Sequence, residues 1–259
     1  MTAPLFHLGP GRLDGLAPEA SVTLDGPEGH HAATVMRLGP GEEVQLSDTV
    51  ATRAAGVVTE AGGGALTVEI REVVQEPRQR PRLVLVQALA KDKRDLQGVE
   101  SATELGVDAV IPWQAERSVA RWKAGREAKK HAEWVSTVTG AAKQTRRTAI
   151  PEVRELVTTA QYLQGAAAAE DVAVVVLHEV EEVSLAAVLE DLGALGDQGV
   201  PEELHLVVGP EGGISEQEIA QLTAAGARTA RLGRTVLRSS TAGPAAVAGA
   251  QVLLGRWDW

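Results

Sequence analysis

The sequence predicts an α/β protein: a parallel sheet with helices on both faces, preceded by a small β-rich domain. Two observations lead to this prediction. From Leu83 onwards, short apolar runs rich in valine and leucine alternate with stretches of helical spacing, which is typical of a parallel sheet covered by helices. Before that point, residues 1–72 contain short β-branched runs separated by glycine, proline or aspartate, and such runs predict the strands of a small barrel.

Four candidate strands and one candidate helix make up the β-rich part. The strands are "SVTL", "EEVQLSD", "AAGVVTEA" and "ALTVEIREV", and the helix is "GHHAATVMRL". The polar stretch "QEPRQRPR" contains two prolines, so it predicts a linker. We therefore expect a first domain over residues 1–74, a linker over 75–82 and a second domain over 83–259.

In the second domain, five candidate strands are "LVLVQAL", "DAVIPW", "EVREL", "DVAVVVLH" and "ELHLVVGP". The stretch "DLQGVESATELGV" has the apolar spacing of a helix. We expect this helix to end at Gly106, because glycine often terminates helices. A long helix is expected in "KAGREAKKHAEWVSTVTGAAKQT", and a helix of small residues in "STAGPAAVAGAQVLLG".

The stretch "HLVVGPEGGIS" places glycines between the end of a strand and the start of a helix. Ser215 and Glu218 have the spacing of a capping box, so we expect the helix to begin at Ser215. Ligands of open α/β sheets bind at this edge, and glycine lets a ligand approach main-chain groups. A tight turn without a ligand is the alternative. The stretch contains neither the Walker loop nor the dinucleotide fingerprint.

Composition excludes several classes of site. The 259 residues contain no cysteine, which excludes disulfides and thiolate metal sites. No His, Asp or Glu cluster has metal-ligand spacing, so we expect no metal. We also expect no signal peptide and no membrane span, because the first residues lack a basic region and no apolar run approaches ~18 residues. A cytoplasmic location fits these expectations.

The net charge of −10 is unevenly distributed. Residues 78–147, the basic segment, hold 15 basic and 8 acidic side chains, whereas both flanking parts are acidic. A localised basic surface is typical of contact with a nucleic-acid backbone. Solvated helix faces are the alternative, since "AGREAKKHAEW" also has the pairing of surface helices. Trp113 and Trp122 lie in this segment, although no aromatic residue stands out as a stacking partner for a base.

Three stretches together resemble a known family. They are "LVVGPEGGIS", "RLGRTVLRSSTA" and "ESATELGVDAVIPW", the last followed closely by "AERS". This ordered set resembles the RsmE family of 16S ribosomal RNA uridine-N3 methyltransferases, which use S-adenosylmethionine and have the SPOUT fold. The stretch "HHAATVMRLGPGEEVQLSD" is similar to the PUA-like RNA-binding domain of that family. The resemblance covers nearly the whole chain.

The resemblance implies a SPOUT-type sheet with a trefoil knot, an N-terminal PUA-like β-barrel and a homodimer whose site is completed at the dimer interface. It also implies that the loops of the knot bind S-adenosylmethionine largely through main-chain groups. The residues expected to contact the donor are Leu177, His178, Val208, Gly209, Pro210, Glu211, Gly212, Gly213, Leu232, Gly233, Val236, Leu237, Ser239 and Ala242.

Methylation at uridine N3 requires that N3 lose its proton, and the negative charge then spreads onto O2 and O4. A cation near those oxygens stabilises the anion, and Arg238 is our candidate; a phosphate contact or a structural ion pair is the alternative. Glu211 is a candidate proton acceptor or, alternatively, holds its loop. Expected contacts to 16S ribosomal RNA or the 30S subunit are Arg37, Lys91, Arg94, Arg117, Arg121 and Arg146.

The sequence departs from the family at one place. Family members often carry "LRTETA" where this chain has "LRSSTA", so Ser239 and Ser240 keep small hydroxyls and lose a carboxylate. Two other functions remain open on the sequence: methylation of a ribose 2′-oxygen by a neighbouring SPOUT branch, and a non-enzymatic RNA-binding or ribosome-assembly module.

Overall fold

The computed structural model describes residues 3–195 and 199–257. The chain forms two compact units. The first contains Met1–Arg78 together with Ala142–Ile150, and the second contains Gln79–Ala141 together with Pro151–Trp259. The boundaries expected from the sequence stay a prediction. The structure adds that a short segment from far along the chain belongs with the first unit.

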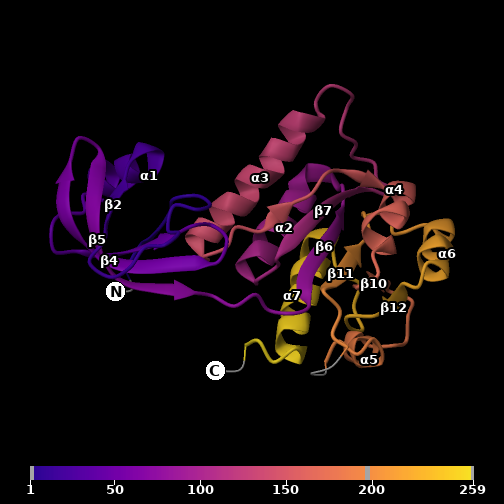
Figure 1. The fold of residues 1–259 in the computed structure, drawn as a ribbon. Helices are drawn as coiled ribbons and strands as arrows, with labels where there is room; N and C mark the ends of the chain where they lie inside the picture. Colours follow the sequence, from indigo (N-terminus) through magenta and orange to yellow (C-terminus); the bar gives the residue numbers. More distant parts are fainter. Residues whose placement is uncertain (1–2, 196–198, 258–259) are drawn as a thin grey trace. The chain divides into compact units, whose positions relative to one another are not determined.

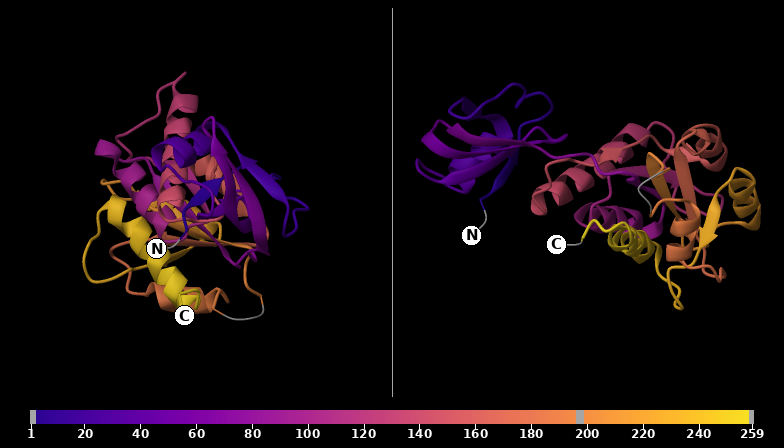
Figure 2. Two further views of the ribbon diagram at one scale, coloured as in Figure 1. Left: turned by 90° about the vertical axis from the view of Figure 1, so that its left-hand side faces the viewer. Right: turned by 60° about the horizontal axis from the view of Figure 1, so that its bottom comes forward.

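A five-stranded sheet forms the first unit (Figures 1 and 2). Its strands run in the order β1-β3-β4-β5-β2, with β1 parallel to β3 and the other pairs antiparallel. Their bounds are β1 Leu5–His7, β2 Ser21–Leu24, β3 Glu43–Ser47, β4 Thr52–Gly62 and β5 Ala65–Gln75. The expected helix is present as α1, Gly26–His30, which continues into a π-helical turn, His31–Val35.

Alternation along these strands builds the core of the first unit. Strand β2 buries every second residue, and the first half of β4 does the same, as expected for a sheet with one face packed and one face in water. Leu24, Leu46, Val68 and Ile70 meet in one cluster and are fully buried. All four strands predicted here are confirmed.

Segment 142–150 is bound to the first unit by polar contacts. The Ser47 hydroxyl donates to the carbonyl of Thr148 over 2.6 Å, and Nε of Arg53 donates to the Thr148 hydroxyl over 2.7 Å. The ring of His7 lies 2.8 Å from the carbonyl of Arg147. No sequence pattern indicated this packing, because the contacts join residues about a hundred positions apart.

The second unit contains a parallel sheet in the order β12-β10-β11-β6-β7-β8, with β9 also paired to β7. The strands are β6 Arg82–Ala88, β7 Ala109–Gln114, β8 Glu152–Val153, β9 Val157–Thr158, β10 Val172–Leu177, β11 Glu203–Val208 and β12 Arg228–Ala230. Every residue of β11 is buried, as expected for a central strand covered on both faces. The candidate strand "EVREL" is reduced to the two residues of β8.

Helices cover both faces of this sheet (Figure 1). Helices α2 (Arg94–Glu104), α5 (Leu185–Asp191) and α7 (Ser239–Leu253) pack together on one face, and α4 (Thr159–Gln164) and α6 (Glu216–Ala224) share a core with the other. Helix α3 spans Glu127–Gln144. Helices α2 and α7 lie side by side (Figure 2). None of the helices within the described ranges is long and apolar enough to cross a membrane.

Candidate functional site

A cavity opens at the edge of the second unit where parallel strands end. It has a volume of about 380 Å³ and is lined by the ends of β10 and β11, the segment leading into α7, and two arginines. This is the edge at which open α/β sheets bind ligands. A smaller side cavity of about 80 Å³ adjoins it and shares Leu177, His178, Glu179, Val236, Leu237 and Ala242 with it.

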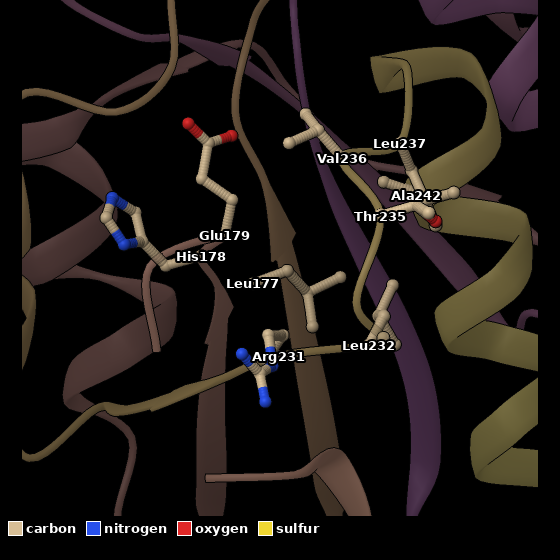
Figure 3. Close-up of a pocket in the computed structure, with 10 residues that line it drawn as sticks. Leu177, His178, Glu179, Arg231, Leu232, Thr235, Val236, Leu237 and Ala242 are labelled. Atoms are coloured by element: carbon tan, nitrogen blue, oxygen red, sulfur yellow. The ribbon is translucent and has the colours of Figure 1, made fainter. Parts of the chain in front are cut away.

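All residues that the sequence suggested for the donor line these two cavities. The main cavity is lined by Leu177, His178, Val208, Gly209, Pro210, Glu211, Gly212, Gly213, Val236, Leu237, Ser239 and Ala242. Leu232 and Gly233 line the side cavity. Figure 3 shows the residues that end β10 on one side of the side cavity, with Val236 and Leu237 of the later segment on the other. Three distant stretches of sequence, 177–179, 208–214 and 231–242, therefore line the two adjoining cavities.

The three glycines after β11 serve different needs. A β-carbon on Gly209 would lie 2.7 Å from Cγ1 of Ile214, and one on Gly212 would lie 3.3 Å from Cβ of Arg117. Gly213 has open space but a φ of +71°, a conformation that residues with a β-carbon seldom adopt. The loop therefore requires glycine at two positions for close packing and at one for its backbone path.

Two contacts hold this loop against the segment after β7. The predicted capping box of α6 is present, with Ser215 accepting the N–H of Glu218. The buried Glu218 carboxylate also accepts the N–H of Glu116 over 2.9 Å and the hydroxyl of Thr159 over 2.6 Å. Nη1 of Arg117 donates to the carbonyl of Gly212 over 3.3 Å. The wall of the main cavity is thus fixed before any ligand enters.

The side chain of Glu211 contacts the segment after β6. Its Oε1 accepts the backbone N–H of Lys91 over 3.1 Å and lies 3.5 Å from Nη1 of Arg94. Through these two contacts the Glu211 carboxylate holds two loops together. This geometry favours the loop-holding role over proton transfer.

Besides Nδ1 of His178, which is buried without a hydrogen-bond partner among the described residues, two flexible groups in the wall are available to a ligand. The Ser239 hydroxyl is buried and has no hydrogen-bond partner among the described residues, and a buried polar atom normally has one. The guanidinium of Arg238 is exposed, and no hydrogen bond or ion pair joins it to another described side chain. Arg238 immediately precedes α7 and is its N-cap residue. Because the hydroxyl rotates freely and the arginine is long, both can adjust to a bound molecule.

The suggested RNA contacts fall into three places. Arg94 and Arg117 line the main cavity, and Lys91 and Arg121 line a separate cavity beside it. Arg37 and Arg146 belong to the first unit. The basic segment is therefore divided between the two units.

Sequence reasoning missed four residues that line the cavities, namely Glu179, Ile214, Arg231 and Thr235. Each is a neighbour of a residue that was suggested, so extending the motifs by one or two positions would have included them. Within the ranges that the structure describes, no three His, Asp or Glu side chains lie close enough to hold a metal ion.

Two family models and curated relatives match this chain. The family model of the RNA methyltransferase domain matches residues 77–251, and that of the RNA methyltransferase PUA domain matches residues 24–71. The chain is 42% identical to the ribosomal RNA small subunit methyltransferase E of Mycobacterium tuberculosis over 100% of this chain and 95% of that protein. The protein of the same name from Bacillus subtilis is 28% identical over 87% of each chain.

Two solved structures have the same fold. A ribosomal RNA small subunit methyltransferase E from Neisseria gonorrhoeae, bound to S-adenosyl methionine, superposes with a TM-score of 0.79 and 25% identity, covering 97% of this chain and 98% of that one. A Legionella pneumophila methyltransferase in complex with its cofactor SAM gives a TM-score of 0.78 and 26% identity over the same shares. With both domain families matched and a full-length relative at 42% identity, the chain belongs to the ribosomal RNA small subunit methyltransferase E family, with an N-terminal PUA domain and a SPOUT-type methyltransferase domain.

Proposed function

We propose that this chain transfers the methyl group of S-adenosylmethionine to N3 of a uridine in 16S ribosomal RNA. One observation carries the proposal: three distant segments, 177–179, 208–214 and 231–242, converge on adjoining cavities with Arg94, Arg117 and Arg238 around the larger one. The names of the relatives and the cofactor bound in the two solved structures support the same reaction.

The residues present fit the donor. Gly209–Gly213 and Leu232–Leu237 offer main-chain groups, and the Ser239 hydroxyl lacks a partner in the described part of the chain. A main cavity of about 380 Å³ also lies within the range of small-molecule sites. When bound, S-adenosylmethionine supplies a methyl carbon attached to a positively charged sulfur, which is open to attack by a nucleophile.

The protein's part in the reaction is to make N3 of uridine a nucleophile. The exposed guanidinium of Arg238 stabilises the negative charge that spreads onto O2 and O4 as N3 loses its proton. Arginine stays charged in proteins, so it is not the base, and water takes the proton. Glu211 keeps the loop closed through Lys91.

The family resemblance supports four further parts of this proposal. The protein acts in the cytoplasm as a homodimer, its site is completed at the dimer interface, and the chain forms a trefoil knot around the donor loops. Its substrate is 16S ribosomal RNA, free or within the 30S subunit. Light scattering of the purified protein tests the dimer, for which a monomeric mass would be contrary evidence.

Mass spectrometry of ribosomal RNA tests the reaction in the cell. A strain without the gene should lose one methyluridine from its 16S RNA, and the wild-type gene should restore it. The Arg238→Ala gene should restore it poorly at equal protein level. An unchanged set of methyluridines in the deletion strain would refute the proposal.

A further inference from the structure

A second cavity lies beside the main one in the same unit. It has a volume of about 320 Å³ and lies between the segment after β6, the loop before α3 and the first turns of α3. We call it the tryptophan pocket. Its lining includes Lys91, Asp95, Arg121, Trp122, Lys130 and Trp134.

Two indole rings form part of its wall. Trp134 is 1% exposed, whereas Trp122 is half-buried. Their ring centroids lie 6.1 Å apart with the planes at 73°, an edge-to-face arrangement that stabilises aromatic pairs. Trp134 therefore holds Trp122 in place, and part of Trp122 remains open to a ligand. Trp113, which also lies in the basic segment, is by contrast 1% exposed, and its indole N–H donates to the hydroxyl of Thr159.

Some of the charged side chains around the pocket have a partner of opposite charge and others do not. The Glu133 carboxylate lies 2.8 Å from Nζ of Lys130 and 3.4 Å from Nζ of Lys93. The hydrogen bond that Lys130 donates lowers the pKa of Glu133. Lys91 and Arg121 have no carboxylate partner among the described residues, although Arg121 donates to the carbonyl of Glu116.

Two further carboxylates line the pocket. Asp92 is exposed. Asp95 is buried and accepts the N–H groups of Leu96 and Ala90. These bonds keep the Asp95 carboxylate within its own turn. The cations left without a carboxylate, Lys91 and Arg121, therefore form the part of the pocket suited to an anion.

A short turn of the chain links the lining of the pocket to that of the main cavity. Lys91 lines the tryptophan pocket, and its backbone N–H binds Glu211 of the main cavity. Arg94, three positions later, lines the main cavity. Between them, Asp92 and Lys93 both have left-handed backbones, with φ of 54° and 59°, which residues with a β-carbon seldom adopt. This turn therefore presents Lys91 and Lys93, with Asp92 between them, to the tryptophan pocket and Arg94 to the main cavity.

We propose that the tryptophan pocket binds a nucleotide of single-stranded RNA adjacent to the target uridine, with its base stacked on Trp122 and its phosphate held by Lys91 and Arg121. Partly open aromatic rings beside unpaired cations are the combination by which proteins hold single-stranded RNA. Stacking accepts any base, so the pocket positions the strand rather than reading its sequence. This inference rests on the proposed function, because it takes the main cavity as the site of the target uridine.

Binding of a short single-stranded oligouridylate to the purified full-length protein tests the pocket. Tryptophan fluorescence should be quenched, and Trp122→Phe should remove most of the quenching. By anisotropy of labelled RNA, Trp122→Ala should weaken binding about tenfold, in line with the loss of one stacked base, while Trp122→Phe keeps most of the affinity. Lys91→Ala and Arg121→Ala should weaken binding and flatten its salt dependence.

Lys129→Ala is the matched control, because Lys129 is an exposed lysine of α3 that does not line the pocket. It should weaken binding less than Lys91→Ala does. Equal effects of Lys91→Ala and Lys129→Ala, or wild-type affinity in Trp122→Ala, would overturn the proposal. If Trp122→Ala alters the circular dichroism spectrum, Arg121→Ala and the quenching decide instead.

The two proposals fail separately. RNA that quenches Trp122 in a protein that methylates no ribosomal RNA would refute only the proposed function. Methylation with an unchanged KM for RNA in Trp122→Ala, Lys91→Ala and Arg121→Ala would refute only the pocket.

Discussion

The carboxylate of Glu211 accepts the backbone N–H of Lys91 over 3.1 Å and lies 3.5 Å from the guanidinium of Arg94. One side chain thus joins the glycine loop after β11 to the turn after β6. Because both loops line the main cavity or its neighbour, this contact sets the shape of the site, and its removal should affect donor binding before it affects chemistry.

Replacement of Glu211 separates a loop-holding role from a proton-accepting one. Glu211→Gln keeps an oxygen that accepts the N–H of Lys91, so it should retain donor affinity and rate within a few-fold, whereas Glu211→Ala should weaken donor binding. Calorimetry with S-adenosylmethionine and single-turnover rates measure the two effects. A Glu211→Gln rate reduced by ~10²–10⁴-fold, the usual contribution of general acid–base catalysis, would instead identify Glu211 as the base.

Gly209→Ala tests the packing of the glycine loop. Its new methyl group would lie 2.7 Å from Cγ1 of Ile214, and such overpacking costs about 1–3 kcal/mol. We expect lower unfolding stability and weaker donor binding by calorimetry. Gly140→Ala is the control, since it adds the same methyl group to an exposed position of α3 with nothing nearby and should stabilise the helix slightly. Unchanged donor affinity in Gly209→Ala would show that the loop tolerates the shift.

Arg238→Ala tests electrostatic stabilisation of the uridine anion. The side chain is exposed and no other described side chain pairs with it, so its loss should leave the fold and donor affinity nearly normal. Removing one such stabiliser typically costs ~10²–10³-fold in rate. The deficit should shrink as pH rises, because hydroxide then helps to remove the proton from N3. A rate near that of the wild type, or a deficit independent of pH, would assign Arg238 to RNA positioning instead.

Three side chains around β11 predict a pH dependence of stability. The Tyr162 hydroxyl lies 2.8 Å from Nδ1 of His205, and Nε2 of His205 lies 2.9 Å from Glu203. Burial lowers the pKa of His205 below 6.5, although Glu203 opposes this. Burial alone would raise the pKa of Glu203, but hydrogen bonds from His205 and Arg154 outweigh it and hold that pKa at about 2.

The sign of the effect follows from proton uptake. Just below pH 6.5 the unfolded chain protonates His205 more fully than the folded chain does, so the free energy of unfolding falls as pH falls, by at most about 1.4 kcal/mol per pH unit, until the folded chain also takes up the proton. The stabilisation that comes from the low pKa of Glu203 is lost only at lower pH, as pH falls toward the folded-state pKa of about 2 and the carboxylate is protonated. Hydrogen exchange of β11 amides measures both. His205→Gln should reduce the slope just below pH 6.5, and the same change at exposed His31 should not. Equal slopes in both variants would contradict this assignment.

The sequence was sufficient for most elements and for the lining of the site. Strand–helix alternation identified the parallel sheet, and the spacing of Ser215 and Glu218 placed the start of α6. These features depend on contacts between near neighbours or on burial of a whole strand, and both leave a local pattern. The motif residues line adjoining cavities because their three segments lie at or after the ends of β10, β11 and β12, and parallel strands bring those ends together.

Long-range polar contacts could not be predicted in this way. The packing of segment 142–150 with the first unit depends on Ser47, Arg53 and Thr148, none of which stands out locally. The same holds for Trp122, which gained a candidate role only when the structure placed it against Trp134 beside Lys91 and Arg121. For Glu211 the sequence left two roles open and favoured the loop-holding one, but only the structure identified Lys91 as its partner.

The position of the transferred methyl group decides whether this chain methylates uridine at N3. Purified protein, S-adenosylmethionine and small-subunit ribosomal RNA from a strain lacking the gene are incubated together, and the RNA is digested to nucleosides for mass spectrometry. We expect one new methyluridine that carries its methyl group on the base at N3, and its absence when donor or protein is omitted. A methyl group on the ribose, or no new methylated nucleoside on free RNA or on 30S subunits, would contradict it.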